Sequence, residues 1–142
     1  MRCLAAASLF ALGTLLPAQT CNFLAFGRPC GGDLAAQQVT SPTNPNNSAL
    51  VLDATNLAPG AVAVLVMGQQ AAGVQLPGSN CLLLVQRNHT ALAQADRTGS
   101  CSWRFPVPLR GTFTLDFQVV TFGFTRNGRL VESTNGVTVG CR

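Results

Sequence analysis

The sequence lacks several residue types on which common protein functions depend. Its 142 residues include no lysine and no tyrosine, only one tryptophan and one histidine, and only 10% of them are charged. A nucleic-acid-binding surface needs basic residues gathered on one face, whereas the arginines of this chain are scattered, mostly beside turns. Sugar-binding platforms use exposed aromatic rings, which are scarce here. The composition therefore argues against nucleic acid as a partner and gives sugar binding by aromatic stacking little support.

Residues for catalysis and metal binding are equally sparse. The one candidate general base is His89, in the polar stretch 88–90, and no G-x-S-x-G motif supplies a serine nucleophile. The cysteines show no C-x-x-C spacing, and no glycine pattern for phosphate precedes a helix. The acidic residues are too dispersed to suggest a glycosidase pair or a calcium loop: Asp33, Asp53, Asp96, Asp116 and Glu132. We therefore expect no catalytic residue, no cofactor and no metal ion, and a protein that is not an enzyme.

An apolar segment opens the chain. Arg2 is the only charged residue before an apolar run over residues 4–16. A basic start, an apolar run of this length and a small residue soon after it are typical of a secretory signal peptide, and a membrane span needs about 20 apolar residues. The alternative is a buried N-terminal helix. We expect a signal peptide over residues 1–18, cleaved after Ala18, and a mature chain over residues 19–142 without a membrane span.

Removal of the signal peptide changes both the charge and the cysteine count. The loss of Arg2 leaves eight of nine basic residues against five acids, a net charge of +3. Cys3 is lost as well, and the cysteines that remain are disulfide candidates in an exported chain: Cys21, Cys30, Cys81, Cys101 and Cys141. Because their number is odd, one thiol is free or pairs with another chain. Spacing alone does not choose the pairs. The expected location is secreted, periplasmic or on the cell surface.

The mature chain consists of short apolar runs separated by Gly, Pro, Asn and Asp. A loop rich in Pro, Asn and Ser over residues 41–48 precedes a strand at 49–54. After Pro59 and Gly60, residues 61–67 are apolar on both faces, as in a central covered strand. Pro77 and Gly78 then precede a further strand over 81–86. No long segment has a helical period, although residues 91–96 could add one helical turn.

Two later segments alternate strictly between apolar and polar residues. In residues 101–107 and 113–119 every second residue is apolar, which turns Trp103 inward and places Asp116 and Gln118 on the solvent face. Residues 96–99 predict a tight turn, and residues 136–139 a closing strand.

The strongest hairpin signal is Asn127-Gly128, since both residues tolerate the positive φ of a type I′ turn. Many short strands without helices between them predict a single all-β domain. We expect an antiparallel β-sandwich, immunoglobulin-like or jelly-roll-like.

The order of short motifs along the mature chain is also informative. It runs through a cysteine among glycines (27–32), then residues 50–53, 56–61, 76–78, 81–85, 96–99, 105–108, 117–120 and 133–140. In this order the chain resembles a domain that recurs at the C-termini of secreted planctomycete proteins. The resemblance implies a β-sandwich without catalytic residues and a disulfide between Cys30 and Cys81. The chain departs from that pattern in its additional cysteines and in standing alone behind its signal peptide.

These observations favour a secreted, non-catalytic module with a structural or interaction role at the cell envelope or outside the cell. Its expected partner is an extracellular or envelope protein or a glycan. The alternative is an extracellular ligand-binding domain, for carbohydrate or protein, or an inhibitor domain. That alternative would use the loops over residues 69–80 and 86–100. An enzyme of unrecognised type would depend on His89.

Overall fold

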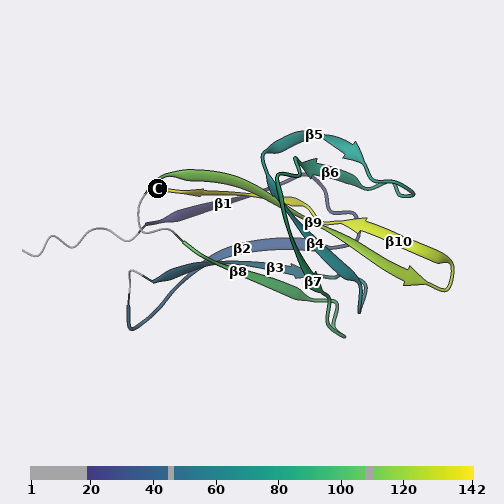
Figure 1. Ribbon diagram of the computed structural model, residues 1–142, viewed down its shortest axis with the longest axis horizontal. Coiled ribbons are helices and arrows are strands. Elements are labelled where there is room, and N and C mark those ends of the chain that lie inside the picture. The colour runs from purple at the N-terminus through teal and green to yellow at the C-terminus, as the bar shows by residue number, and fades with distance from the viewer. Residues whose placement is uncertain (1–18, 45–46, 108–110) are drawn as a thin grey trace, which may run out of the picture.

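The computed structural model describes residues 19–44, 47–107 and 111–142, and these residues form antiparallel β-sheets with no helix (Figure 1). The expected signal peptide, residues 1–18, lies outside the described residues. The strands found in the described part are β1 (Cys21–Phe26), β2 (Asp33–Thr40), β3 (Ser48–Thr55), β4 (Val62–Gly68), β5 (Gln70–Gln75), β6 (Leu82–Val85), β7 (His89–Gln94), β8 (Cys101–Pro106), β9 (Phe113–Thr125), β10 (Gly128–Ser133) and β11 (Gly136–Cys141).

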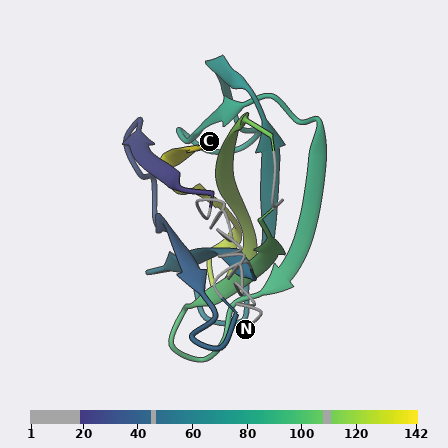
Figure 2. The same cartoon turned by 90° about the vertical axis from the view of Figure 1, so that its left-hand side faces the viewer.

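These strands form three layers. The large sheet has the order β1-β11-β9-β4-β7, with β10 also paired to β9, and the small sheet has the order β2-β3-β8. The third layer is the hairpin of β5 and β6, which lies on the opposite side of the large sheet from the small sheet (Figure 1). Figure 2 shows the layers from the side, with β1 at one edge of the large sheet. The predicted all-β antiparallel sandwich is confirmed.

The core lies between the large and small sheets and is filled by alternate residues of their strands. Leu52 of β3 and Trp103 of β8 come from the small sheet, and Leu65 of β4, Val119 of β9 and Val139 of β11 come from the large sheet. All five are buried, Trp103 being 8% exposed. This is the arrangement that a period of two predicts for packed sheets.

Strands β10 and β11 lie along the same edge of β9, with an irregularity where they meet. Ser133 pairs with Val120, and Val137 pairs with Phe117. Between these pairs the chain advances four residues from β10 to β11 but only three residues along β9. Such an extra residue is a β-bulge. At this bulge Thr134 keeps β9 paired: its N–H donates to the Val119 carbonyl at 2.9 Å, and its hydroxyl accepts from the Val119 N–H at 3.0 Å.

Three local predictions are wrong in detail. Residues 91–96 contain no helical turn, because residues up to Gln94 belong to β7, which pairs with β4. The hairpin at Asn127-Gly128 is present, but its turn is not type I′: of these two residues only Gly128 has a positive φ, of 118°. The segments proposed as ligand-binding loops, residues 69–80 and 86–100, are not loops throughout, because they contain the six-residue strands β5 and β7.

Candidate functional site

Away from its strands β1 and β11, the outer face of the large sheet, which is turned away from the small sheet, has two halves with different surroundings. The β5–β6 hairpin packs against β9 and β4 and covers one half, which we call the covered half. The other half carries four exposed apolar side chains that we call the apolar strip: Val62 of β4, Leu92 of β7, and Phe122 and Phe124 of β9. Both halves include parts of β4 and β9. The exposure of their side chains differs because the β5–β6 hairpin covers only one half.

In the covered half, a buried side-chain amide on β9 makes hydrogen bonds to the backbone of β6. Gln118 of β9 is 0% exposed. Its side-chain oxygen accepts from the Leu84 N–H at 2.7 Å, and its NH₂ group donates to the carbonyls of Leu82 and Thr134, both at 2.9 Å. Because an unpaired buried amide is costly, these bonds fix the position of β6 on the sheet.

Two more polar side chains hold the same hairpin. Asp116, 8% exposed, accepts through Oδ2 from the Gln70 N–H at 2.8 Å, and through Oδ1 from the Thr138 hydroxyl. Ser133 donates its hydroxyl to the Leu82 carbonyl at 3.1 Å. The predicted solvent-facing position of Asp116 and Gln118 is therefore wrong. Both face away from the main core as expected, but a hairpin formed by an earlier part of the chain covers them.

The glycine-flanked cysteine of residues 27–32 also serves the covered half. Cys30 forms a disulfide with Cys81, just before β6, and this is the pair that the resemblance implied. The backbone of Cys30 exchanges hydrogen bonds with that of Ser133 at 2.7 and 3.1 Å. A Cβ added at Gly27 would lie 2.2 Å from the Leu84 side chain, and one at Gly31 would lie 2.4 Å from the carboxyl of Glu132. This motif therefore packs the chain beneath the hairpin.

A second buried amide joins the large sheet to the small one. Asn135, in the bulge before β11, accepts from the Leu34 N–H at 2.9 Å and donates to the Leu34 carbonyl at 3.0 Å. The next residue, Gly136, lies so close to Phe26 that an added Cβ would be 2.2 Å from its ring. The sequence motif 133–136 thus has a structural role, which sequence reasoning missed because its partners are far away along the chain.

A second disulfide joins Cys21 of β1 to Cys141 of β11, so the described part of the chain contains two intramolecular bridges. Disulfides of this kind are typical of extracellular or periplasmic proteins. Among the residues that the structure describes, Cys101 is the free cysteine, and it is half-buried. Burial, followed by the nearby negative charge of Asp96, raises the pKa of the Cys101 thiol. The thiol is therefore held in its less reactive, protonated form.

The open half of the sheet face presents large apolar groups to solvent. Phe124 is 87% exposed, Leu92 73%, Val62 46% and Phe122 43%. Val62 and Phe122 are direct partners in the β4–β9 ladder, so their side chains lie side by side. Exposed apolar side chains that adjoin on one sheet face form a candidate interaction site.

The strip ends at a cationic hairpin tip. The β9–β10 hairpin reaches one end of the molecule (Figure 1). Residues 124–129 include Arg126 and Arg129 and no acidic residue. Arg129 is the direct ladder partner of Phe124, so its side chain leaves the sheet on the same face as the exposed ring. The strip therefore combines apolar side chains with positive charge at its end.

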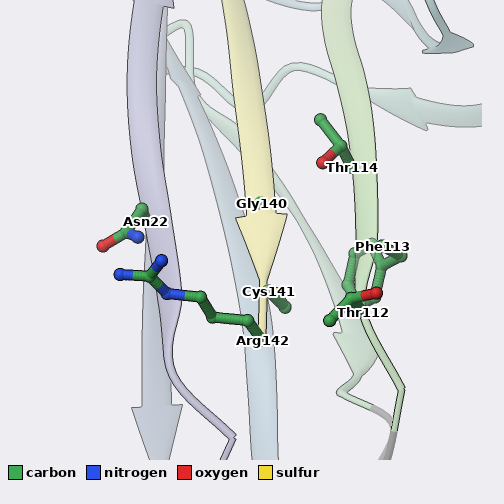
Figure 3. A pocket seen from close by; sticks show the side chains of 7 residues that line it. All are labelled: Asn22, Thr112, Phe113, Thr114, Gly140, Cys141 and Arg142. Atoms are coloured by element: carbon green, nitrogen blue, oxygen red, sulfur yellow. The ribbon is translucent and has the colours of Figure 1, made fainter.

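Hollows also lie elsewhere on the described part of the molecule. An apolar cleft of about 340 Å³ separates the ends of the two sheets, lined by Leu50, Met67, Phe105, Pro106, Val107, Phe113, Leu115 and Phe117. A shallow hollow of about 410 Å³, which we call the polar hollow after the Asn22, Thr114 and Arg142 side chains in its lining, lies on the outer face of β1, β11 and β9. Figure 3 shows Asn22 and Arg142 on one side of Gly140 and Thr114 on the other. Gly140 pairs with both Asn22 and Thr114, and its missing side chain leaves the hollow between them.

Of the other residues singled out in the sequence, the structure brings Asp53, Asp96 and Cys101 near one another and leaves His89 apart from them. His89 begins β7 and is exposed beside Met67, with which it pairs. Asp53 and Asp96 line a shallow pocket with Cys101, but within residues 19–44, 47–107 and 111–142 no three potential metal ligands are grouped. Asp96 instead organises the predicted turn. Its Oδ1 accepts from the Thr98 hydroxyl at 2.6 Å and from the Ser100 N–H at 3.0 Å, and these bonds lower the pKa of Asp96.

Comparisons with known proteins give no match: no family model, no curated protein and no solved structure resembles this chain closely enough to be identified. Among the described residues there is also no helix with the length and apolar character that crossing a bilayer requires.

Proposed function

We propose that this chain is an exported, non-catalytic binding module that attaches to a component of the cell envelope or extracellular surface through its apolar strip. After removal of residues 1–18 it acts in a secreted, periplasmic or surface-bound state. The observation that carries this proposal is the exposure of Phe124, 87%, beside Val62, Leu92 and Phe122. The two intramolecular disulfides support the oxidising location.

The surroundings of the strip support a binding role. Binding surfaces combine aromatic residues and arginine with few lysines and acids, and Phe122, Phe124, Arg126 and Arg129 match this composition. The strip lies on β9 and β4, which Gln118 and the third layer hold in place from the other half. A surface on rigid strands loses little entropy when it binds. We also propose membership of the planctomycete domain family that the sequence resembles, on the order of its motifs from residues 27–32 to residues 133–140.

Cosedimentation with the envelope fraction of the producing cells tests the proposal. The protein is expressed with its own leader, purified from the medium or periplasm, and compared as wild type, Phe124→Ser and Leu24→Ser. Leu24 is the matched control, because it is 67% exposed on β1 of the same sheet. We expect wild type and Leu24→Ser to sediment with the envelope and Phe124→Ser to stay in solution. Equal binding by all three would overturn the assignment of the strip.

Carbohydrate binding at the polar hollow is the second candidate function. It is favoured by the side chains around Gly140, since Asn22, Thr112, Thr114 and Arg142 offer amide, hydroxyl and guanidinium groups to sugar hydroxyls. A glycan array probed with wild type and Asn22→Ala distinguishes the two functions. A signal that Asn22→Ala abolishes and Phe124→Ser retains would favour the hollow.

A further inference from the structure

We propose that the apolar strip and the β9–β10 tip dock on an anionic lipid surface, with the Phe122 and Phe124 rings among the acyl chains and Arg126 and Arg129 against the phosphate groups. This inference rests on the proposed function and names the partner of the same site. It follows from the charge of the tip, from the exposure of its outermost ring and from the position of both on one face.

Charge complementarity favours a negatively charged partner. Residues 124–129 contain two arginines and no acid, and Arg129 lies directly opposite Phe124 on the outer face. Arginine donates several hydrogen bonds in a planar fork that matches phosphate oxygens. Basic residues beside an apolar surface are also the composition of segments that bind at the boundary between headgroups and acyl chains.

The exposure of Phe124 favours a fluid partner over a protein. At 87% exposed, the ring is almost unsupported by its own chain. An aromatic anchor in a protein complex fills a packed, preformed pocket in its partner, whereas acyl chains rearrange around any ring that enters. Leu92 and Val62 continue the apolar surface from Phe122 across β4 and β7, so the contact would be broad and would lie along one sheet face.

The covered half sets the limit of the proposed lipid contact on the sheet. There Val85 of β6 packs in one cluster with Val66, Val120 and Val131 of the large sheet, and these side chains are at most 9% exposed. Val131 is the ladder partner of Phe122, so the boundary between shielded and exposed residues passes between them. We therefore expect the lipid contact to stop at Val131 and to leave the hairpin of β5 and β6 in water.

Fluorescence with protein-free vesicles tests this inference. Phe124→Trp is mixed with vesicles of phosphatidylglycerol and phosphatidylcholine, and separately with vesicles of phosphatidylcholine alone. The native Trp103 is 8% exposed and serves as a constant background. We expect a blue shift of the emission with anionic vesicles that high salt weakens, and roughly tenfold or greater loss of binding by Phe124→Ser, because burial of one phenylalanine side chain contributes a factor of about this size. Arg126→Gln with Arg129→Gln should abolish the preference for anionic vesicles, and Leu24→Ser should bind as wild type.

The outcomes separate this inference from the proposed function. Unchanged Phe124→Trp emission with anionic vesicles would overturn the lipid inference. If wild type still sediments with envelopes through Phe124, and protease treatment of those envelopes abolishes the binding, the partner is a protein and the proposed function stands. Concentration-dependent dimers in sedimentation equilibrium that Phe124→Ser disrupts would assign the strip to a second copy and would overturn the lipid inference as well.

Discussion

The covered and open halves of the large sheet's outer face reverse the usual distribution of residues. In the covered half Gln118, Asp116 and Ser133 are buried, whereas in the open half Phe124 and Leu92 are 87% and 73% exposed. The buried polar groups all have hydrogen-bond partners, so each fixes one position of the third layer. The exposed apolar side chains hold no other part of the chain in position. The difference separates residues that stabilise the fold from residues available to a partner.

The largest effect should come from removing the disulfide of the covered half. Replacing both Cys30 and Cys81 with alanine opens a loop of sequence separation 51, which should lower the free energy of unfolding by about 4 kcal/mol. Urea denaturation monitored by Trp103 fluorescence measures this loss. As a control, Cys101→Ala removes the free thiol and should change stability little. If the double variant unfolds at the same urea concentration as wild type, the disulfide does not anchor the third layer.

Gln118→Leu should have the next largest effect. The change leaves the Leu84 N–H and the carbonyls of Leu82 and Thr134 without their side-chain partner, which should cost about 2–3 kcal/mol. Thr114→Val, on the same face of β9 but exposed, is the matched control and should stay within about 0.5 kcal/mol of wild type. Equal urea midpoints for the two variants would contradict the role of the buried amide.

A smaller, pH-dependent effect is expected from Glu132 of β10, which lies beside Ser133 in the chain but on the opposite face of the large sheet. Burial raises the pKa of Glu132 above its ordinary value of 4.5. A raised carboxyl pKa means that the folded state binds the proton more tightly, so this stabilising contribution is complete below the unfolded pKa and is lost as pH rises through the folded pKa. Glu132→Gln should therefore raise the urea midpoint at pH 7 and leave it unchanged at pH 3. A midpoint that Glu132→Gln lowers at pH 7 would contradict this sign.

The smallest effect on stability should come from the open half. Phe124→Ser removes a ring that is 87% exposed, so the free energy of unfolding should change by less than about 0.5 kcal/mol. Differential scanning calorimetry checks this directly, with Phe117→Ser as the contrasting change, because Phe117 is 2% exposed in the main core. A large destabilisation by Phe124→Ser would mean that the strip is part of the fold's own packing.

The main core could be predicted from the sequence because alternation is a local signal. Trp103, Val119 and Val139 lie inward as their spacing indicates. The surroundings of the outer face could not be predicted, because the Leu84 N–H that pairs with Gln118 is 34 residues away, and the Leu34 backbone that pairs with Asn135 is 101 residues away. For the same reason spacing could not pair Cys21 with Cys141, at a separation of 120.

The candidate site shows the same limit. Phe122 and Phe124 are visible in the sequence as alternating apolar residues, like Val120 two positions earlier. Only the placement of β5 and β6 decides that Val120 is 3% exposed while Phe124 is 87% exposed. The sequence assigned no site to His89 or to the dispersed acids, and the described residues include no group of three potential metal ligands.

Amide hydrogen exchange of the protein bound to envelope membranes tests the central claim most directly. The account predicts that binding slows exchange in β7 and in the β9–β10 hairpin up to Val131, and leaves exchange unchanged in β6 and around the polar hollow at Asn22 and Gly140. Slowed exchange at the polar hollow or over β5 and β6, with none at the β9–β10 tip, would contradict it.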